Sequence, residues 1–277
     1  MGLPADRPAL ELAFRAGRTL DAHVSALYAA YDALQAVPFL DQAAAVAGDV
    51  NVLPKVETGN RLREARANYD AVKAKSGAPP RARPAQGIGF SATFEIANGR
   101  MDDMVAEQGR VADLIVMRLP TAQEEAMLST VVHAAIMETS GPVILAPNDV
   151  QGEPFERIAV AWNGSASAAQ AMRHALPLLS KAAEVTVLGV HNPVFGGPPA
   201  AQAVDYLGWH GIATRAVAVD VSGGKPVGFA LLEAASKVGA GMLVMGAYSQ
   251  SRVRRMIAGG VTRAVMERTG LPIFLAH

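Results

Sequence analysis

Short apolar runs alternate with helix-like stretches along residues 157–276, and this alternation constrains the fold more than any other feature. The runs are uninterrupted, as expected for strands that are buried on both faces. The stretches between them place apolar residues at helical spacing. Alternating strands and helices indicate crossover connections and a mostly parallel, doubly wound α/β sheet with helices on both faces. The expected strands are residues 157–161, 184–190, 214–219, 241–245 and 272–276, and the expected helices are residues 165–179, a stretch ending at His210, 227–238 and 261–268.

The first half of the chain repeats much of this pattern. Two copies of one domain explain the repeat, with the polar residues 148–154 (NDVQGEP) as the linker. We expect one domain at residues 1–147 and another at 155–277. The matched segments are 22–27 with 183–188, 113–117 with 241–245 and 139–146 with 269–276, and the first copy adds a strand at 90–96 and a helix at 62–75.

The two copies differ at their start. When Val24 is aligned with Val185, Met1 falls on Trp162, so the counterpart of strand 157–161 would lie before residue 1. That strand is central in a doubly wound sheet, and its loss would leave backbone groups of both neighbours unpaired. Two explanations are open: the given chain begins downstream of its natural start, which we favour, or another segment fills the gap.

Composition excludes several classes of function. Lys and Arg together number 25, as do Asp and Glu, so no global basic field attracts nucleic acid. Without cysteine the chain has no disulfide, no thiolate nucleophile and no cysteine zinc site. The histidines lack metal-ligand spacing, and no apolar window approaches the roughly 20 residues of a membrane span. We expect a cytoplasmic protein without metal, membrane or nucleic-acid partner.

The segment 246–262 (GAYSQSRVRRMIAGGVT) carries the clearest chemistry. Gly246 follows the fourth strand, at the edge where ligands bind in such sheets. Gly259 and Gly260 precede a helix, whose N-terminus offers N–H donors and partial positive charge to phosphate. The arginines between them can grip phosphate oxygens. The alternative is an ordinary tight loop with solvated arginines. The arginines are Arg252, Arg254 and Arg255.

Two further motifs do not support catalysis. The run Ser222-Gly-Gly-Lys225 is followed by Pro226, so it is not a P-loop, and we expect a strand-to-helix turn. Ser165 and Ser222 lack the G-x-S-x-G surroundings of a hydrolase nucleophile. We therefore expect no enzyme.

The segment at 246–262 resembles the universal stress protein family. Nucleotide-binding members carry glycine, two residues, glycine, nine residues, glycine, then serine or threonine. Gly246 and Gly259 match this pattern, whereas Ser249 and Gly260 stand where glycine and Ser/Thr are usual. The stretch VAWNGS (160–165) resembles the family's first strand and turn, with Asn163 where aspartate is common. The resemblance is strong over 155–277 and weak over 1–147.

The resemblance implies two adenine-nucleotide-α-hydrolase-like (Rossmann-like) domains, each with a mostly parallel five-stranded sheet, the first lacking its first strand. It implies a stress-response protein that binds ATP or AMP, with or without Mg²⁺, in the second domain. A nucleotide-free scaffold is the alternative, and a slow ATPase is the enzymatic one, although no catalytic base is evident. The expected contacts are Ala161, Trp162, Asn163, Val190, His191, Gly246, Ser249, Arg252, Gly259, Gly260, Val261 and Thr262.

The first copy departs from the same pattern. Residues 118–121 (RLPT) replace its glycine-rich opening, and Ser129 and Thr130 fall where Gly259 and Gly260 lie. We expect this copy to bind no nucleotide and to act as a partner surface. The two domains should pair through their last strands, 142–146 and 272–276, because pairing satisfies an open sheet edge. A homodimer is the further assembly considered.

Overall fold

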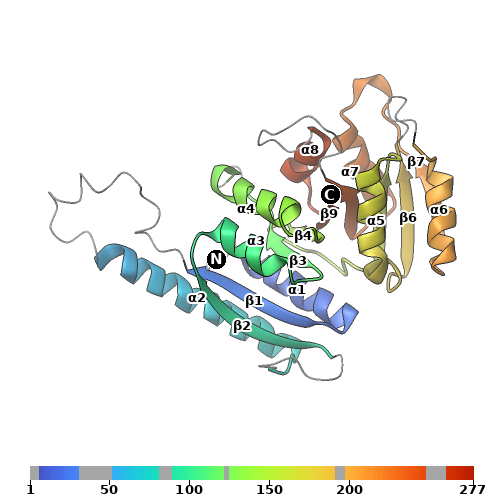
Figure 1. The fold of residues 1–277 in the computed structure, drawn as a ribbon. Helices are drawn as coiled ribbons and strands as arrows, with labels where there is room; N and C mark the ends of the chain where they lie inside the picture. Colours follow the sequence, from blue (N-terminus) through green and yellow to red (C-terminus); the bar gives the residue numbers. More distant parts are fainter. Residues whose placement is uncertain (1–5, 31–51, 81–88, 122–124, 191–196, 248–259) are drawn as a thin grey trace.

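The structure is a computed structural model (Figure 1). It describes residues 6–30, 52–80, 89–121, 125–190, 197–247 and 260–277. Among these residues, no helix is long and apolar enough to cross a membrane.

The second half forms the doubly wound sheet expected from its sequence. Its strands follow the order β9-β8-β5-β6-β7, with parallel neighbours throughout. The strands are β5 (Arg157–Trp162), β6 (Glu184–Gly189), β7 (Thr214–Ala218), β8 (Met242–Gly246) and β9 (Ile273–Ala276). The helices are α5 (Ala166–Leu179), α6 (Ala200–Trp209), α7 (Val227–Lys237) and α8 (Gly260–Arg268).

The central strand β5 shows why helices cover both faces of this sheet. Ile158, Val160 and Trp162 join a core with α5 and α6. Ala159 and Ala161 join a second core with α7 and α8. Successive side chains of a strand point to opposite faces, so an uninterrupted apolar run must be buried on both. Residues 158–162 of β5 are indeed all buried.

The first half contains the same kinds of element in the same order. Its strands are β1 (His23–Ala30), β2 (Ser91–Asn98), β3 (Ile115–Arg118) and β4 (Val143–Ala146). Its helices are α1 (Arg7–Leu20), α2 (Val52–Ser76), α3 (Met101–Gly109) and α4 (Glu125–Met137). The helix α2 starts ten residues before the expected helix at 62–75.

The strands of the first half do not form one sheet, which corrects the expected single sheet in this copy. β1 and β2 form a separate parallel pair, whereas β3 and β4 continue the sheet of the second half. The junction is an antiparallel pairing of β4 with β9, in which Ile144 lies opposite Phe274. Figure 1 shows β1 and β2 lying apart from the strands around the C-terminus. The physical reason is that, among the described residues, no strand bridges β1 and β3 as β5 bridges β6 and β8.

Helix α1 holds the divided half together. It contacts β3 and β4, as its counterpart α5 contacts β8 and β9. Its residues Leu12 and Ala16 join the core shared with α5. On another side, Phe14 packs in a small core with Tyr69, Val72 and other residues next to β2. The helix therefore buries side chains in two separate cores.

Candidate functional site

The turn after β5 is organised by its own polar side chains. Ser165 occupies the N-cap of α5, and its Oγ accepts a hydrogen bond of 3.2 Å from the backbone N–H of Ala168. The Asn163 Oδ1 accepts from the Ser165 N–H at 3.1 Å and from the Ser165 hydroxyl at 2.7 Å. The side-chain oxygen of Asn163 thus fixes the turn. A contact from Asn163 to a base or ribose would have to come from its amide NH₂ group.

Gly246 lies at the end of β8, directly against the first turn of α5. A Cβ at this position would lie 2.6 Å from the Ala168 nitrogen and 2.6 Å from the Ser167 carbonyl carbon. Real side chains do not approach backbone this closely, so glycine is required by packing alone. The same closeness brings the end of β8 beside the turn that contains Asn163 and Ser165.

The segment after residue 196 covers the turn at the end of β5. The Trp162 Nε1–H donates a 2.8 Å hydrogen bond to the carbonyl oxygen of Pro198. Gly164 has a φ of +76°, and a Cβ there would lie 2.8 Å from the Gly197 Cα. Trp162 is buried and belongs to the core against α5. The side chain of Trp162 therefore serves packing and holds residues 197–198 in place.

Val190 and Ala161 lie where the sequence places them, beside the same turn. The Val190 N–H donates to the Trp162 carbonyl oxygen at 2.8 Å, which continues the β5–β6 ladder. Ala161 is buried against the α7 and α8 side of the sheet. Both residues fix the backbone at the carboxyl edge of the sheet.

The first residue of α8 has free space around it, whereas the third residue is buried. A Cβ at Gly260 would meet nothing within 4 Å, so packing does not demand glycine there. Val261 is exposed, whereas Thr262 is buried. The burial of Thr262 favours a role in packing α8 over the phosphate contact expected from the sequence.

The remaining predicted contacts, His191, Ser249, Arg252 and Gly259, lie outside the described residues, as do Arg254 and Arg255. The described part of the site therefore brings together two groups. Asn163 and Gly246 meet at the carboxyl edge of the adjacent strands β5 and β8. This is the switch point of the strand order, where doubly wound sheets bind ligands.

The equivalent place in the first half is filled by a buried ion pair. Arg118, the counterpart of Gly246, ends β3 with its side chain 3% exposed. Its Nε lies 2.8 Å from the Oδ1 of Asp6, at the N-cap of α1. A guanidinium group thus occupies the space beside this helix N-terminus. Sequence reasoning noted Arg118 but missed its partner. The signal was available, because the repeat register aligns Asp6 with Ser167, the residue against Gly246.

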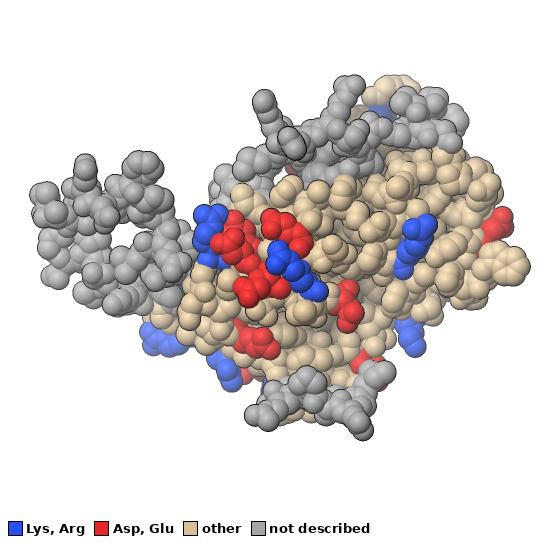
Figure 2. Space-filling view, viewed as in Figure 1, with Lys and Arg blue, Asp and Glu red and all other residues tan. Residues whose placement is uncertain are grey.

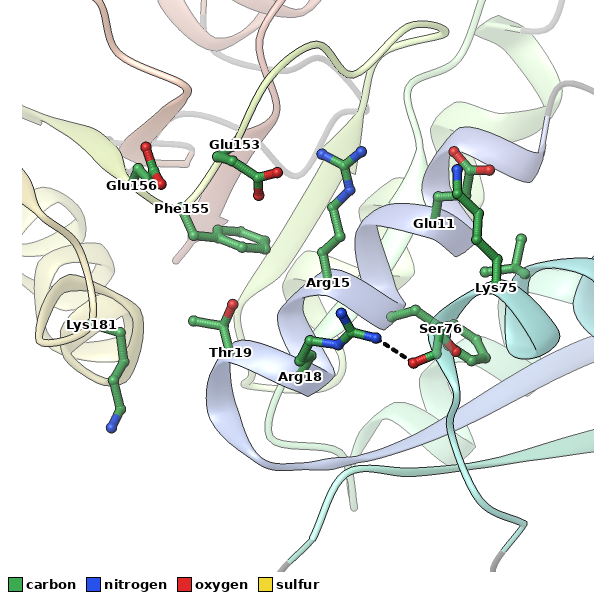
Figure 3. A pocket seen from close by; sticks show the side chains of 12 residues that line it. Glu11, Arg15, Arg18, Thr19, Lys75, Ser76, Glu153, Phe155, Glu156 and Lys181 are labelled. Carbon is green, nitrogen blue, oxygen red and sulfur yellow. Dashed lines mark hydrogen bonds between the residues drawn. The ribbon is translucent and has the colours of Figure 1, made fainter.

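One described cavity, of about 320 Å³, lies between α1, the end of α2 and the linker (Figure 3). The arginines that line the cavity donate hydrogen bonds to backbone carbonyl oxygens. The Arg15 Nη1 donates to the Gly152 carbonyl oxygen at 2.6 Å, and the Arg18 guanidinium donates to the Ser76 carbonyl oxygen. These bonds tie α1 to the linker and to α2. The cavity therefore lies where hydrogen bonds join α1 to α2 and to the linker.

The charged side chains on the face in Figure 2 are of both signs. Acidic side chains gather near α3, whose first turn carries Asp102 and Asp103, with basic groups beside them. The described part of this face thus offers no single-sign basic field of the kind that nucleic acids require. Among the described residues, no group of three or more His, Asp or Glu side chains could hold a metal ion.

The strand order and the site at the switch point define the second half as a Rossmann-like α/β domain. Residues 154–277 match the model of the Universal stress protein family. The match does not extend over residues 1–147, so a second domain of this family in the first half stays a prediction. No curated protein sequence matches the chain.

Among solved structures, a universal stress protein from Archaeoglobus fulgidus DSM 4304 is similar to the chain with a TM-score of 0.63 at 15% identity, covering 97% of this chain and 92% of that one. A functionally unknown protein from Pseudomonas aeruginosa PAO1 is similar with a TM-score of 0.49 at 13% identity, covering 94% of each chain. At these identities the first likeness supports the fold alone, and the second score is too low to carry an argument.

Proposed function

We propose that the protein is a non-catalytic stress-response protein that binds ATP or AMP at the carboxyl edge of β5 and β8. The observation that carries the proposal is the close approach of Gly246 to the first turn of α5. This contact places the backbone at the end of β8, with no side chain, directly beside a helix N-terminus, and such termini favour phosphate. The family match of residues 154–277 supports the same reading.

The first half supports the proposal by contrast. There the position of Gly246 is taken by Arg118, whose guanidinium pairs with Asp6 at the N-terminus of α1. A phosphate would have to displace a carboxylate from a buried arginine, which is unfavourable. We therefore expect one nucleotide per chain, bound in the second half.

Isothermal titration calorimetry with ATP and with AMP on the full chain tests this function. We expect a stoichiometry of one and an affinity that falls at least tenfold in the variant R252A/R254A/R255A. The matched control is R63A/R173A/R215A, which also removes three arginines, all exposed, from elsewhere. Absence of binding by the unaltered chain, or equal affinity in both variants, would contradict the proposal.

A nucleotide-free scaffold is the second candidate, and two observations favour it. The Asn163 Oδ1 is engaged by Ser165, and residues 197–198 lie over the turn where adenosine would bind. Under this alternative neither nucleotide raises the melting temperature, whereas bound nucleotide stabilises the folded state by mass action. A phosphate-release assay addresses the ATPase alternative, and we expect no release above the rate without protein.

A further inference from the structure

Two strands of the first half have one strand partner each where their counterparts have two. β1 pairs with β2, and β3 pairs with β4, among the residues that the structure describes. In the second half, the counterparts β6 and β8 each pair with β5 as well. The facing edges of β1 and β3 thus correspond to the two edges that β5 occupies in the second half.

A cavity of about 470 Å³ lies between these two edges. Residues 24–29 of β1 and the whole of β3 line it, together with parts of α1, α2 and α3. We call it the β1–β3 slot. Much of its lining is apolar, including Leu10, Ala13, Leu27, Met101, Val105 and Val116.

The burial of the flanking strands indicates that the slot is incompletely filled. In β6 the four central residues are buried, whereas in β1 only Tyr28 and Ala29 are. In β8 the first four residues are buried, whereas the first two residues of β3 are half-buried. Apolar surface and strand edges exposed together favour the addition of another strand.

The second half supplies a template for the occupant. β5 runs parallel to both neighbours, with Ile158 opposite Val185 of β6 and Met242 of β8. Its larger side chains face α5, and its two alanines face α7 and α8. An occupant of the β1–β3 slot would likewise place larger apolar residues toward α1 and small residues toward α3.

We propose that the β1–β3 slot binds an extended apolar segment of another polypeptide, which adds as a strand parallel to β1 and β3. Six residues, the length of β5, would span the slot. Backbone hydrogen bonds to the two edges would supply affinity, and the alternation of large and small apolar side chains would supply specificity.

A labelled peptide with the sequence of residues 155–164 is the probe, titrated with the full chain and followed by fluorescence anisotropy. We expect saturable binding. The same peptide with Val160→Pro should bind at least tenfold more weakly, because proline removes an N–H donor and cannot join a central strand. Unsaturable binding, or equal binding of both peptides, would overturn the proposal.

Two variants of the chain locate the bound peptide. Ala26→Lys places a charge on β1 in the slot and should weaken binding at least tenfold. Ile96→Lys, on β2 at a residue that is 53% exposed and absent from the lining, should leave binding unchanged. Because these variants could affect folding, circular dichroism must first match that of the unaltered chain. Equal affinity in both variants would place the peptide elsewhere and overturn the proposal.

The source of the strand is tested by covalent fusion and by sedimentation. A chain with the probe sequence fused before Met1 through a flexible linker should melt at a higher temperature and no longer bind free peptide. Stabilisation of this fusion while the unaltered chain binds no free peptide would overturn donation by another polypeptide. Concentration-dependent dimers that free peptide dissociates would assign the slot to a second copy of this chain and overturn its occupation by a different polypeptide.

Discussion

Among the residues that the structure describes, the two halves contain the same order of strands and helices apart from one strand. That strand decides whether a half closes into one sheet. In the second half β5 joins β6 to β8, and all five strands form one continuous sheet. In the first half β1 and β3 belong to different sheets. A central strand therefore does more than add burial, because it joins two pairs of strands that otherwise separate.

The halves also differ at the position where a ligand would meet the helix after the first strand. Gly246 presents only backbone to the first turn of α5, whereas Arg118 presents a guanidinium to Asp6 at α1. In the proposed function the second half offers its helix N-terminus to an anion, whereas the first half fills the equivalent place with an ion pair. Two differences, Arg118 for Gly246 and Asp6 for Ser167, separate a candidate binding site from a structural contact.

The largest effect is expected from Arg118→Ala, which removes the ion pair that distinguishes the first half from the second. Removing one partner of a buried pair leaves the other uncompensated, so we expect a loss of about 3 kcal/mol in the free energy of unfolding. Urea denaturation measures it. The control Arg7→Ala removes an arginine that is 49% exposed and pairs with Glu11, and it should cost at most about 1 kcal/mol. Equal losses would show that the Arg118 pair is not special.

Gly246→Ala tests the corresponding position in the second half. The added methyl would collide with the backbone of Ser167 and Ala168, so we expect a loss of about 1–3 kcal/mol in stability. Nucleotide binding should weaken as well if the proposed site is correct. Gly260→Ala is the control, because nothing lies within 4 Å of its Cβ and the substitution should not destabilise the chain. A stable Gly246→Ala chain would contradict the described packing.

Ser165→Ala sharpens the comparison of the two helix N-termini. Ser165 caps α5 through Ala168, whereas Asp6 makes no side-chain cap bond to α1 because it pairs with Arg118. Loss of the cap should destabilise the chain by about 1 kcal/mol. Ser236→Ala, at an exposed position inside α7, should change stability by a few tenths of a kcal/mol at most. Equal effects of the two substitutions would argue against the cap.

The smallest effect concerns acid stability, for which the counterpart helices α3 and α7 each carry one responsive carboxyl group. Hydrogen bonds from Lys225 and Lys237 lower the pKa of Glu233 to about 2, and a hydrogen bond from Arg100 lowers the pKa of Asp102. A carboxyl group with a lowered folded-state pKa stabilises the fold above its unfolded pKa. For Glu233 that contribution is lost as the pH falls from about 4.5 to about 2.

Urea midpoints across that pH range measure this contribution in the unaltered chain and in Glu233→Gln. The unaltered chain should lose slightly more stability on acidification than the variant. Because the Glu233 side chain is exposed to solvent, the difference should be small and should shrink further in high salt. A difference that grows with salt would contradict an electrostatic origin.

The strands of the second half could be predicted because their signal is local. Uninterrupted apolar runs such as 157–161 and 241–245 ended at glycine or asparagine, and the structure confirms strands there. The register that sets Met1 on Trp162 gives no counterpart of β5 within the first copy, and among the described residues no strand joins β1 to β3. The division of that copy into two sheets could not be predicted, because it depends on how β3 and β4 pair with a distant strand.

The candidate site was harder to predict from sequence, because single residues have more than one use. The sequence predicts a phosphate contact at Gly246, but packing against Ser167 also explains the glycine. It predicts a ligand contact at Asn163, but the side-chain oxygen of Asn163 accepts hydrogen bonds from Ser165. It predicts a hydroxyl donor at Thr262, but Thr262 is buried in α8. These alternatives depend on neighbours that are distant in sequence and adjacent only in the fold.

Amide hydrogen exchange on the full chain tests most directly whether the first half lacks a central strand. Exchange of buried, paired amides requires larger openings than exchange at open strand edges. We predict slow exchange throughout β6 and β8, and faster exchange at alternate amides along the facing edges of β1 and β3. Equally slow exchange in all four strands would mean that the β1–β3 slot is already filled, and would contradict this prediction.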